Sequence, residues 1–446
     1  MSPIPSLPQE AITTLLNFTL QDRITGSLIG SALGDTIGLY TEFLSSAQAA
    51  TSYPSRTFTL HPGPTPFHLD RHRAPFTPGH WTDDTDHSLL LLLSFLHQST
   101  PSSHIFPTQS DFASRLRIWA SQGFKPLGTM PLGLGRLLGT VLASKGFAEE
   151  PEGIARGYWM GTNRFAAPNG SLMRTHVLGL VTVWEEETKC FELGAEISRA
   201  THVDPRCVVA CVVGSGLVRE LVRGEVTRGE DIDGVIERGR RWYESVVGRR
   251  DEDPGVDWEE LWRVCDGKDG LEGLRLDDGA SIGFVYKTLG AGVVLLRMAM
   301  ARNRGVLDRS RLFEELITEL VMKGGDADTN ACFAGALLGA YLGFAALPDH
   351  WRNGMVHGKW LVGKAESLCQ VLNVKDGQYN GQEDADTAPL GGKPEISQQD
   401  MEAKWMVFQQ EVVRKMEEAK KTDETKTTEP KSKSAWSVPW KKPKKP

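Results

Sequence analysis

Apolar residues recur three or four positions apart along most of this chain, and polar residues fill the positions between them. That spacing is typical of amphipathic α-helices, because it gathers apolar side chains on one face. No segment shows the strict alternation expected of a half-buried strand, and no solenoid-type repeat is present. The sequence therefore predicts an all-α fold, with helices over residues 9–19, 22–43, 84–98, 110–121, 131–145, 170–184, 189–200, 205–222, 229–247, 280–302, 309–323, 329–347 and 358–372.

Two of these predicted helices carry glycines at four-residue intervals. The helix over residues 22–43 contains Gly26, Gly30, Gly34 and Gly38, and the helix over residues 329–347 contains Gly335, Gly339 and Gly343. Each interior glycine costs a helix up to about 1 kcal/mol relative to alanine. The close approach of another helix explains such a stripe, so we expect tight helix–helix packing at these positions.

The chain divides by composition into four parts. Residues 9–372 are predicted to form one helical domain, and residues 373–395 a linker. Residues 396–420 are predicted to form an amphipathic helix that docks on the domain or binds a partner. Residues 421–446, rich in Lys, Thr, Glu, Ser and Pro, cannot bury enough surface to fold, which predicts a disordered basic tail. The apolar positions of the amphipathic helix are Met401, Trp405, Phe408, Val412 and Met416.

Composition and charge narrow the class of protein. The chain has 446 residues, of which 40% are hydrophobic and 24% charged, and its net charge of −7 argues against nucleic-acid binding by the core. No uncharged apolar stretch is long enough to cross a membrane, and the first residues lack the features of a signal peptide. The six cysteines include no C-x-x-C pair, so we expect buried free thiols. These features predict a monomeric enzyme of the cytoplasm, with the nucleus as a further compartment.

Residues 45–80 form a loop rich in Pro, Ser and His that is too long to be a passive connector, so a lid over a cleft is a reasonable interpretation. Its histidines suggest a zinc site, but the spacing of His61, His68, His72 and His80 fits no zinc-ligand pattern.

Two short acidic clusters, each at the start of an apolar helical run, carry the candidate chemistry. The first is Trp81–Asp86 (WTDDTD) and the second is Gly324–Thr329 (GGDADT). A single Asp or Thr would suffice to cap a helix, and capping is the alternative interpretation for either cluster alone. Several neighbouring carboxylates repel one another unless they take up protons or hold a cation. Oxygen ligands suit Mg²⁺ or Mn²⁺, so the pair predicts a two-metal hydrolytic site if the fold brings both clusters together.

A third copy of the tetrapeptide DADT provides a comparison within the chain. Asp384–Thr387 repeats Asp326–Thr329, but no Gly-Gly precedes it and Pro389 follows it. Proline cannot continue a helix, so this copy is predicted to lie in solvated linker.

Asp35 and Glu42 lie seven positions apart on the predicted glycine-rich helix, and therefore on one face. A buried acid needs a partner or a wet cleft. A salt bridge is one interpretation for either residue and is favoured for Asp35. Glu42 ends the apolar run and is the better candidate for acid/base catalysis.

Five stretches together resemble the ADP-ribosylglycohydrolase family: Gly26–Asp35 with Glu42, Trp81–Thr85, Pro168–Arg174, Thr201-His202 and Gly324–Thr329. They occur in the order typical of the family and span roughly residues 20–347. The resemblance implies a compact all-α orthogonal bundle with a binuclear metal cleft that binds ADP-ribose and two Mg²⁺ ions, with Mn²⁺ as an alternative. Pro168 stands where the family often has Gly, and Ala327 where it usually has Thr or another small residue.

The resemblance also implies roles for individual residues. The implied metal ligands are Thr82, Asp83, Asp84, Asp326, Asp328 and Thr329. Glu42 would be the catalytic acid, and Asp84 would help to activate water. The residues implied to contact ADP-ribose are Gly133, Gly135, Asn169, Gly170, Ser171, Met173, Arg174 and His202. The expected activity is Mg²⁺-dependent hydrolysis of the bond between ADP-ribose and a protein side chain or small conjugate. A catalytically silent, ADP-ribose-binding or structural relative is the alternative.

Overall fold

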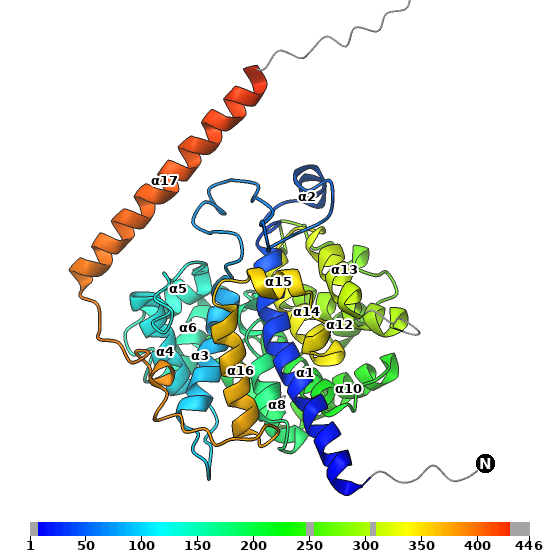
Figure 1. Ribbon diagram of the computed structural model, residues 1–446. Coiled ribbons are helices and arrows are strands. Elements are labelled where there is room, and N and C mark those ends of the chain that lie inside the picture. Colours follow the sequence, from blue (N-terminus) through cyan, green and yellow to red (C-terminus); the bar gives the residue numbers. More distant parts are fainter. Residues whose placement is uncertain (1–7, 247–253, 304–308, 429–446) are drawn as a thin grey trace, which may run out of the picture.

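The computed structural model describes residues 8–246, 254–303 and 309–428, and these form helices joined by loops (Figure 1). The described residues contain no β-strand, only isolated bridges. The all-α prediction is therefore confirmed. The helices are α1 (Gln9–Gly38), α2 (Ser46–Ser52), α3 (Asp83–His97), α4 (Gln109–Gln122), α5 (Arg136–Ala143), α6 (Pro151–Gly161), α7 (His176–Val181), α8 (Glu187–Arg199), α9 (Pro205–Arg223), α10 (Gly229–Val246), α11 (Trp258–Cys265), α12 (Val285–Arg302), α13 (Arg309–Val321), α14 (Ala327–Leu342), α15 (Asp349–Gly354), α16 (Gly358–Val371) and α17 (Gln398–Thr428), with 3₁₀ turns η1 (Asn169–Ser171), η2 (Glu272–Leu274), η3 (Phe344–Ala346) and η4 (Ala385–Thr387).

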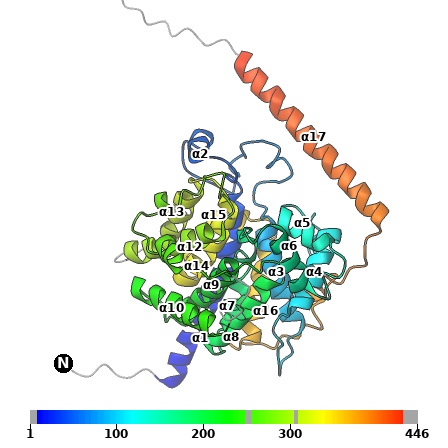
Figure 2. The same cartoon turned by 180° about the vertical axis from the view of Figure 1, so that it is seen from behind.

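Helices α1 and α14 lie side by side through the body of the molecule (Figures 1 and 2). Their glycines face each other: a Cβ added to Gly30 would lie 2.5 Å from the carbonyl oxygen of Gly335, and one added to Gly34 would lie 1.9 Å from that of Ala331. The predicted close approach is therefore confirmed, and α1 and α14 are each other's partner. The contact matters for function because each helix carries an acidic residue of the site described below.

The other helices build one large apolar core around this pair. Helix α9 is buried along almost its whole length and packs against α7, α8, α12 and α14. The six cysteines are buried free thiols, as predicted. No described helix has the length and apolar character needed to cross a bilayer.

Several helix boundaries differ from the predictions. The helices predicted over 9–19 and 22–43 are the single helix α1, which ends at Gly38, because backbone bonds from Tyr40 and Thr41 to Ile37 and Gly38 close a turn there. Glu42 therefore lies in a turn and not on the helix. The helix predicted over 170–184 is the short turn η1 followed by α7, and the one predicted over 280–302 begins only at Val285. The short helices α2, α6 and α15 were not predicted.

The segment predicted as a linker, residues 373–395, packs against the domain. The buried Lys364 ammonium donates to both carboxylate oxygens of Asp384, at 2.8 and 2.6 Å, and the Trp360 indole donates to Asp386 at 2.7 Å. The Thr387 side chain is fully buried. The prediction that Asp384–Thr387 is solvated is therefore wrong, because this copy of the motif neutralises a buried cation.

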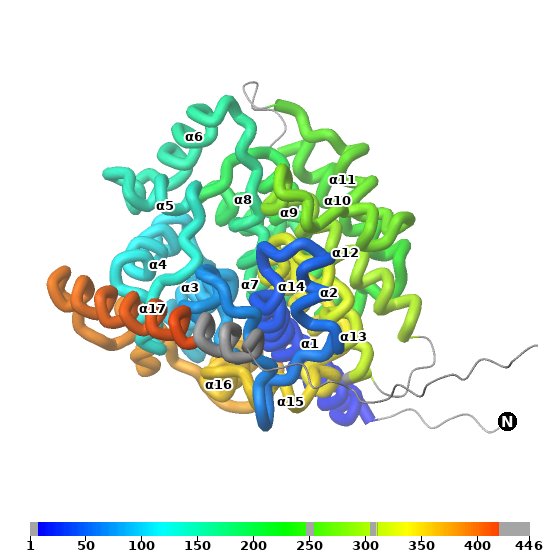
Figure 3. Tube along the Cα trace, turned by 90° about the horizontal axis from the view of Figure 1, so that it is seen from above, coloured from blue at the N-terminus to red at the C-terminus, as the bar shows by residue number. Residues whose placement is uncertain are grey.

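Helix α17 leaves this segment and projects beyond the body (Figure 1), and seen from above it runs past the α3 and α4 side (Figure 3). It extends to Thr428, eight residues beyond the predicted end at residue 420. Residues 429–446 of the predicted tail lie outside the described residues.

Candidate active site

Backbone hydrogen bonds bring Glu42 to the second acidic cluster. The Phe43 amide donates to the Gly325 carbonyl at 2.6 Å, and the Gly325 amide donates to the Leu44 carbonyl at 2.9 Å. Gly324 and Gly325 adopt φ angles of +68° and +73°, and a Cβ on either would lie 2.1 Å from a backbone oxygen. Only glycine fits such a left-handed, closely packed turn. The Gly-Gly pair therefore distinguishes this copy of the DADT motif from the one at Asp384.

Asp35 ties α1 to the start of α3. Its carboxylate accepts hydrogen bonds from the amide and hydroxyl of Thr82, at 3.0 and 2.9 Å, and from those of Thr85, at 3.0 and 2.5 Å. The Asp35 side chain is fully buried, and no described Lys or Arg pairs with it. The predicted salt bridge is therefore wrong, and donors at a helix N-terminus satisfy this carboxylate instead.

The fold brings the acidic residues of three segments to one place. Carboxylate oxygens of Asp35, Asp84 and Asp328 lie within 4.8 Å of one another, and so do those of Glu42, Asp326 and Asp328. Asp328 belongs to both groups. Two oxygen-only groups that share a carboxylate could hold two hard cations close together.

Burial raises the pKa values of the aspartate carboxyls in these two groups. Burial raises the pKa of Asp35 to about 6, against the lowering effect of its four hydrogen bonds. Burial and the charge of Glu42 raise the pKa of Asp326 to about 6. Burial and neighbouring carboxylates hold the pKa values of Asp84 and Asp328 well above their usual range.

A buried oxygen without a partner also fits a bound cation. Asp84 Oδ2 accepts from the Thr82 hydroxyl at 3.1 Å, whereas the buried Asp84 Oδ1 has no hydrogen-bond partner. A buried anionic oxygen in that state is costly, and a metal ion would satisfy it. The residues present therefore fit a metal ion.

Not all predicted metal ligands belong to the two groups. Asp84, Asp326 and Asp328 do, and Thr82 and Thr329 line the adjacent cavity. Asp83 lines the cavity but lies against Gly133, whose added Cβ would be 1.9 Å from Asp83 Oδ1. Asp35, which was not predicted as a ligand, belongs to one of the groups, and Asp83 belongs to neither.

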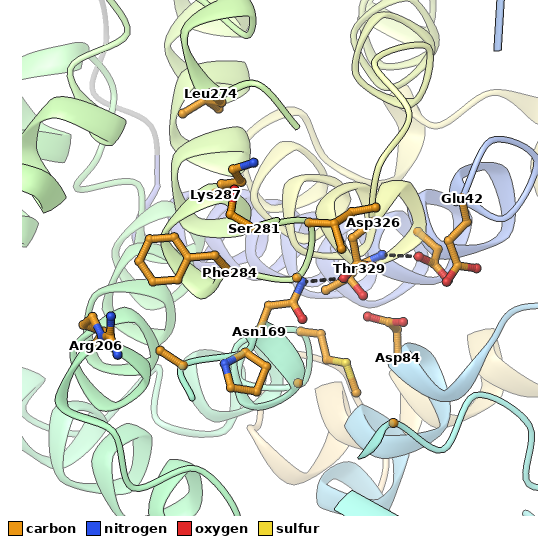
Figure 4. A pocket seen from close by; sticks show the side chains of 18 of the residues that line it. Glu42, Asp84, Asn169, Arg206, Leu274, Ser281, Phe284, Lys287, Asp326 and Thr329 are labelled. Atoms are coloured by element: carbon orange, nitrogen blue, oxygen red, sulfur yellow. Dashed lines mark hydrogen bonds between the residues drawn. The ribbon is translucent and has the colours of Figure 1, made fainter. Parts of the chain in front are cut away.

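The acidic residues lie at one end of a cavity of about 1330 Å³. Figure 4 shows Glu42, Asp84, Asp326 and Thr329 gathered on one side, Asn169 beside them, and Phe284 and Arg206 further along. Six of the eight residues predicted to contact substrate line the cavity: Gly133, Gly135, Asn169, Gly170, Met173 and His202. Such a cavity is large enough for a nucleotide-sized ligand.

Asn169 and His202 are held in fixed positions within the cavity wall. The Asn169 amide donates to the Thr288 hydroxyl at 2.9 Å and to Asp326 Oδ2 at 3.0 Å. His202 Nδ1 lies 2.6 Å from the Thr201 hydroxyl. Burial, and then the charge of Arg174, hold the His202 pKa well below its usual range, so the ring is neutral near pH 7.

The structure corrects the prediction for Ser171 and Arg174. Both side chains are fully buried and neither lines the cavity. Arg174 donates to the Gly170 and Ile197 carbonyls and to the Thr201 hydroxyl, and Ser171 accepts from Ser198 at 3.2 Å. These two residues therefore support Gly170 and the Thr201–His202 pair from behind.

His72 is part of the site but was not predicted. Its Nε2 lies 2.5 Å from a Glu42 carboxylate oxygen. His72 belongs to the 45–80 segment that was interpreted as a lid, but no local pattern links it to Glu42, because the two residues are thirty positions apart. Asp35 had a signal, its seven-residue spacing from Glu42, but this was interpreted as a salt bridge.

Comparison with known proteins agrees with this geometry. A family model described as ADP-ribosylglycohydrolase matches residues 17–378. The chain belongs to the ADP-ribosylglycohydrolase family. A putative ADP-ribosyl glycohydrolase of Acanthamoeba polyphaga mimivirus is 23% identical over 352 residues, covering 77% of this chain and 93% of the relative. An uncharacterized protein of Archaeoglobus fulgidus is 25% identical over 362 residues, covering 79% and 97%.

A solved structure described as an ADP-ribosylglycohydrolase-related protein complex has the same fold, with a TM-score of 0.51 and 23% identity. The match covers 79% of this chain and 99% of that one. The predicted family and fold are therefore confirmed. Family membership identifies the chain as a glycosidic-bond hydrolase from a metal-dependent family. Helix α17 of this chain lies beyond the residues that match the family model.

Proposed function

We propose that this ADP-ribosylglycohydrolase uses two Mg²⁺ ions to cleave the bond between the anomeric carbon of a terminal ribose and its leaving group. The observation that carries the proposal is that Asp328 belongs to two carboxylate groups at one end of the cavity. Mn²⁺, which accepts the same oxygen ligands, would substitute for Mg²⁺.

The side chains that would hold the ions are Asp35, Asp84 and Asp328 in one group and Asp326 and Asp328 in the other, and Glu42 lies beside this second group. Bound ions would neutralise these acids and lower the pKa of a coordinated water. Thr82 and Thr329 supply hydroxyl oxygens beside the two groups.

Glu42 is placed to move a proton. Its side chain is 8% exposed, lines the cavity and contacts His72, while the Phe43–Gly325 hydrogen bond fixes the backbone next to it. As the ribose–leaving-group bond breaks, the protonated Glu42 carboxyl would give its proton to the departing atom, and the Asp84 carboxylate would take a proton from the water that adds to the anomeric carbon. The carboxylate charge that the ions leave uncompensated would stabilise the oxocarbenium-like transition state.

The rest of the cavity binds the ADP-ribose moiety. Asn169 and the neutral His202 ring present polar groups beside the acidic end, and Gly135, with no atom within 4 Å of a Cβ added to it, leaves the backbone open to close approach. A phosphate or ribose hydroxyl can accept or donate at these positions without competing with a fixed charge.

A panel of substrates tests this function. Purified protein would be incubated with arginine-linked, serine-linked, O-acetyl and polymeric ADP-ribose conjugates, with Mg²⁺ or with EDTA, and free ADP-ribose measured. We expect Mg²⁺-dependent release from at least one conjugate and none from Asp328→Asn. ADP-ribose binding without release from any conjugate would instead identify the silent relative.

A further inference from the structure

Helix α17 reaches the active site through the segment that holds Glu42. We infer that Lys415 and Phe408 of this helix are positioning residues for Glu42, acting through residues 72–76. The inference rests on the proposed function in assigning Glu42 a catalytic role. It concerns a part of the chain outside the residues that match the family, 17–378.

The 72–76 segment is bound to Glu42 at two points. His72 Nε2 lies 2.5 Å from the Glu42 carboxylate. The fully buried Arg73 side chain donates to the Glu42 carbonyl, and also to the Leu39 and Tyr40 carbonyls at 3.0 Å each. Arg73 thereby fixes the backbone that carries Glu42, and His72 fixes its side chain. A shift of this segment would therefore move the Glu42 carboxylate.

Helix α17 holds the same segment from the outside. The Lys415 ammonium donates to the Phe76 carbonyl at 3.2 Å and to the Ala74 carbonyl at 3.4 Å. The ammonium thus joins two carbonyls of one short segment, and such charge-assisted bonds are stronger than neutral ones. Ala74 and Phe76 lie two and four residues beyond His72.

Phe408, two helical turns before Lys415, lies on the pocket beside this segment. It lines a pocket of about 240 Å³ together with Phe76, His80, Trp81 and Thr82. Phe76 and Thr82 also line the main cavity, so they form the wall between the two spaces. The Phe76 and His72 ring centroids are 6.2 Å apart. Phe76 therefore lies between the pocket that Phe408 lines and the His72–Glu42 pair.

The base of α17 is anchored independently of these contacts. Met401 is 8% exposed, Gln122 exchanges hydrogen bonds with Ile396 at 3.1 and 2.7 Å, and Lys125 donates to the Pro394 carbonyl at 2.6 Å. Because the start of the helix is fixed, its bonds from Lys415 and the pocket wall at Phe408 can hold residues 72–76 in one position. The opposite face, with Met406 59% and Val407 67% exposed, has no such contact.

Substitutions in the full-length chain test the inference. Lys415→Met removes the donor and Phe408→Ala the aromatic wall, and Lys404→Met and Met406→Ala are matched controls on exposed positions of the same helix. We expect the first two variants to lower kcat about three- to tenfold with little change in KM, because misplacing a catalytic group slows chemistry more than binding. Both controls should match wild type, and Lys415→Arg, which keeps a donor, should recover most of the loss.

A double-mutant cycle separates positioning from general destabilisation. If Lys415 acts through His72, the losses from Lys415→Met and His72→Ala will not add in the double variant. Additive losses, or wild-type kcat in both Lys415→Met and Phe408→Ala, would overturn the inference.

Hydrogen exchange of residues 70–80 gives a readout that needs no activity. Faster exchange in Phe408→Ala than in Met406→Ala supports the inference even if wild type releases no ADP-ribose, in which case only the proposed function fails. Equal exchange in these two variants and wild type overturns the inference and leaves the proposed function standing.

Discussion

Removing the Asp326 charge should stabilise the metal-free protein. Burial and the charge of Glu42 raise the pKa of this carboxyl from 3.8 to about 6, which corresponds to about 3 kcal/mol lost on ionisation in the folded state. Because Asp326 lines an open cavity, solvent screening reduces this to about 1–2 kcal/mol. Asp326→Asn keeps an acceptor for the Asn169 amide, so it removes the charge with little change in packing.

The sign of the pH dependence follows from the raised pKa. Below about pH 4 the carboxyl is protonated in both folded and unfolded states and costs nothing. Between pH 4 and 6 the folded state binds the proton more tightly, so wild-type stability falls as pH rises, and above pH 6 the whole cost is present. In EDTA at pH 8, the free energy of unfolding of Asp326→Asn should therefore be about 1–2 kcal/mol higher than that of wild type. This difference should vanish near pH 4.

Urea unfolding in EDTA at both pH values measures this, with Asp376→Asn as the control because Asp376 is an exposed carboxylate away from the site. Adding Mg²⁺ should stabilise wild type more than Asp326→Asn, since ligand binding to the folded state raises its stability. The reasoning is refuted if Asp326→Asn is less stable than wild type in EDTA at pH 8, or if its effect is the same at pH 4.

Three further substitutions test separate parts of the account. Glu42→Gln should lower kcat by about 10²–10⁴-fold with ADP-ribose affinity, measured by calorimetry, within several-fold of wild type; loss of binding in proportion would make Glu42 structural. In a denaturation assay, Gly34→Ala should lower the free energy of unfolding by about 1–3 kcal/mol, because its Cβ would lie 1.9 Å from the Ala331 carbonyl oxygen. The control Gly363→Ala, whose Cβ would have no atom within 4 Å, should be neutral or stabilising in the same assay. Asp384→Asn should cost about 1–3 kcal/mol by leaving the Lys364 ammonium poorly compensated, and metal content and hydrolysis should not change; unaltered stability would contradict the pairing.

Much of the site could be predicted because its parts are local motifs. The WTDDTD and GGDADT sequences each begin a helix, and the glycine stripes that bring α1 and α14 together are visible at four-residue intervals. These features depend on backbone geometry that nearby residues determine. The fold class follows from the helical spacing of apolar residues, whereas the cavity-lining residues Asn169 and His202 were implied by the family resemblance alone.

The features that were mispredicted depend on distant partners. Arg174 has the character of an anion-binding residue in sequence, but its bonds to Ile197 and Thr201 bury it behind the cavity. Asp384 resembles a metal ligand or a solvated residue until Lys364 is placed beside it. The His72–Glu42 contact, likewise, is determined by how the 45–80 segment folds back, which no local pattern encodes.

Metal titration of the EDTA-stripped protein tests the central claim most directly. Mn²⁺ binding followed by electron paramagnetic resonance would count the ions and report whether two of them are close enough to couple, with Mg²⁺ calorimetry as a second count. The two groups that share Asp328 predict two ions per chain, coupled in wild type, and loss of the coupled pair in Asp328→Asn but not in Asp376→Asn. Binding of no ion, or an unchanged coupled pair in Asp328→Asn, would contradict the claim that these carboxylates form a two-metal site.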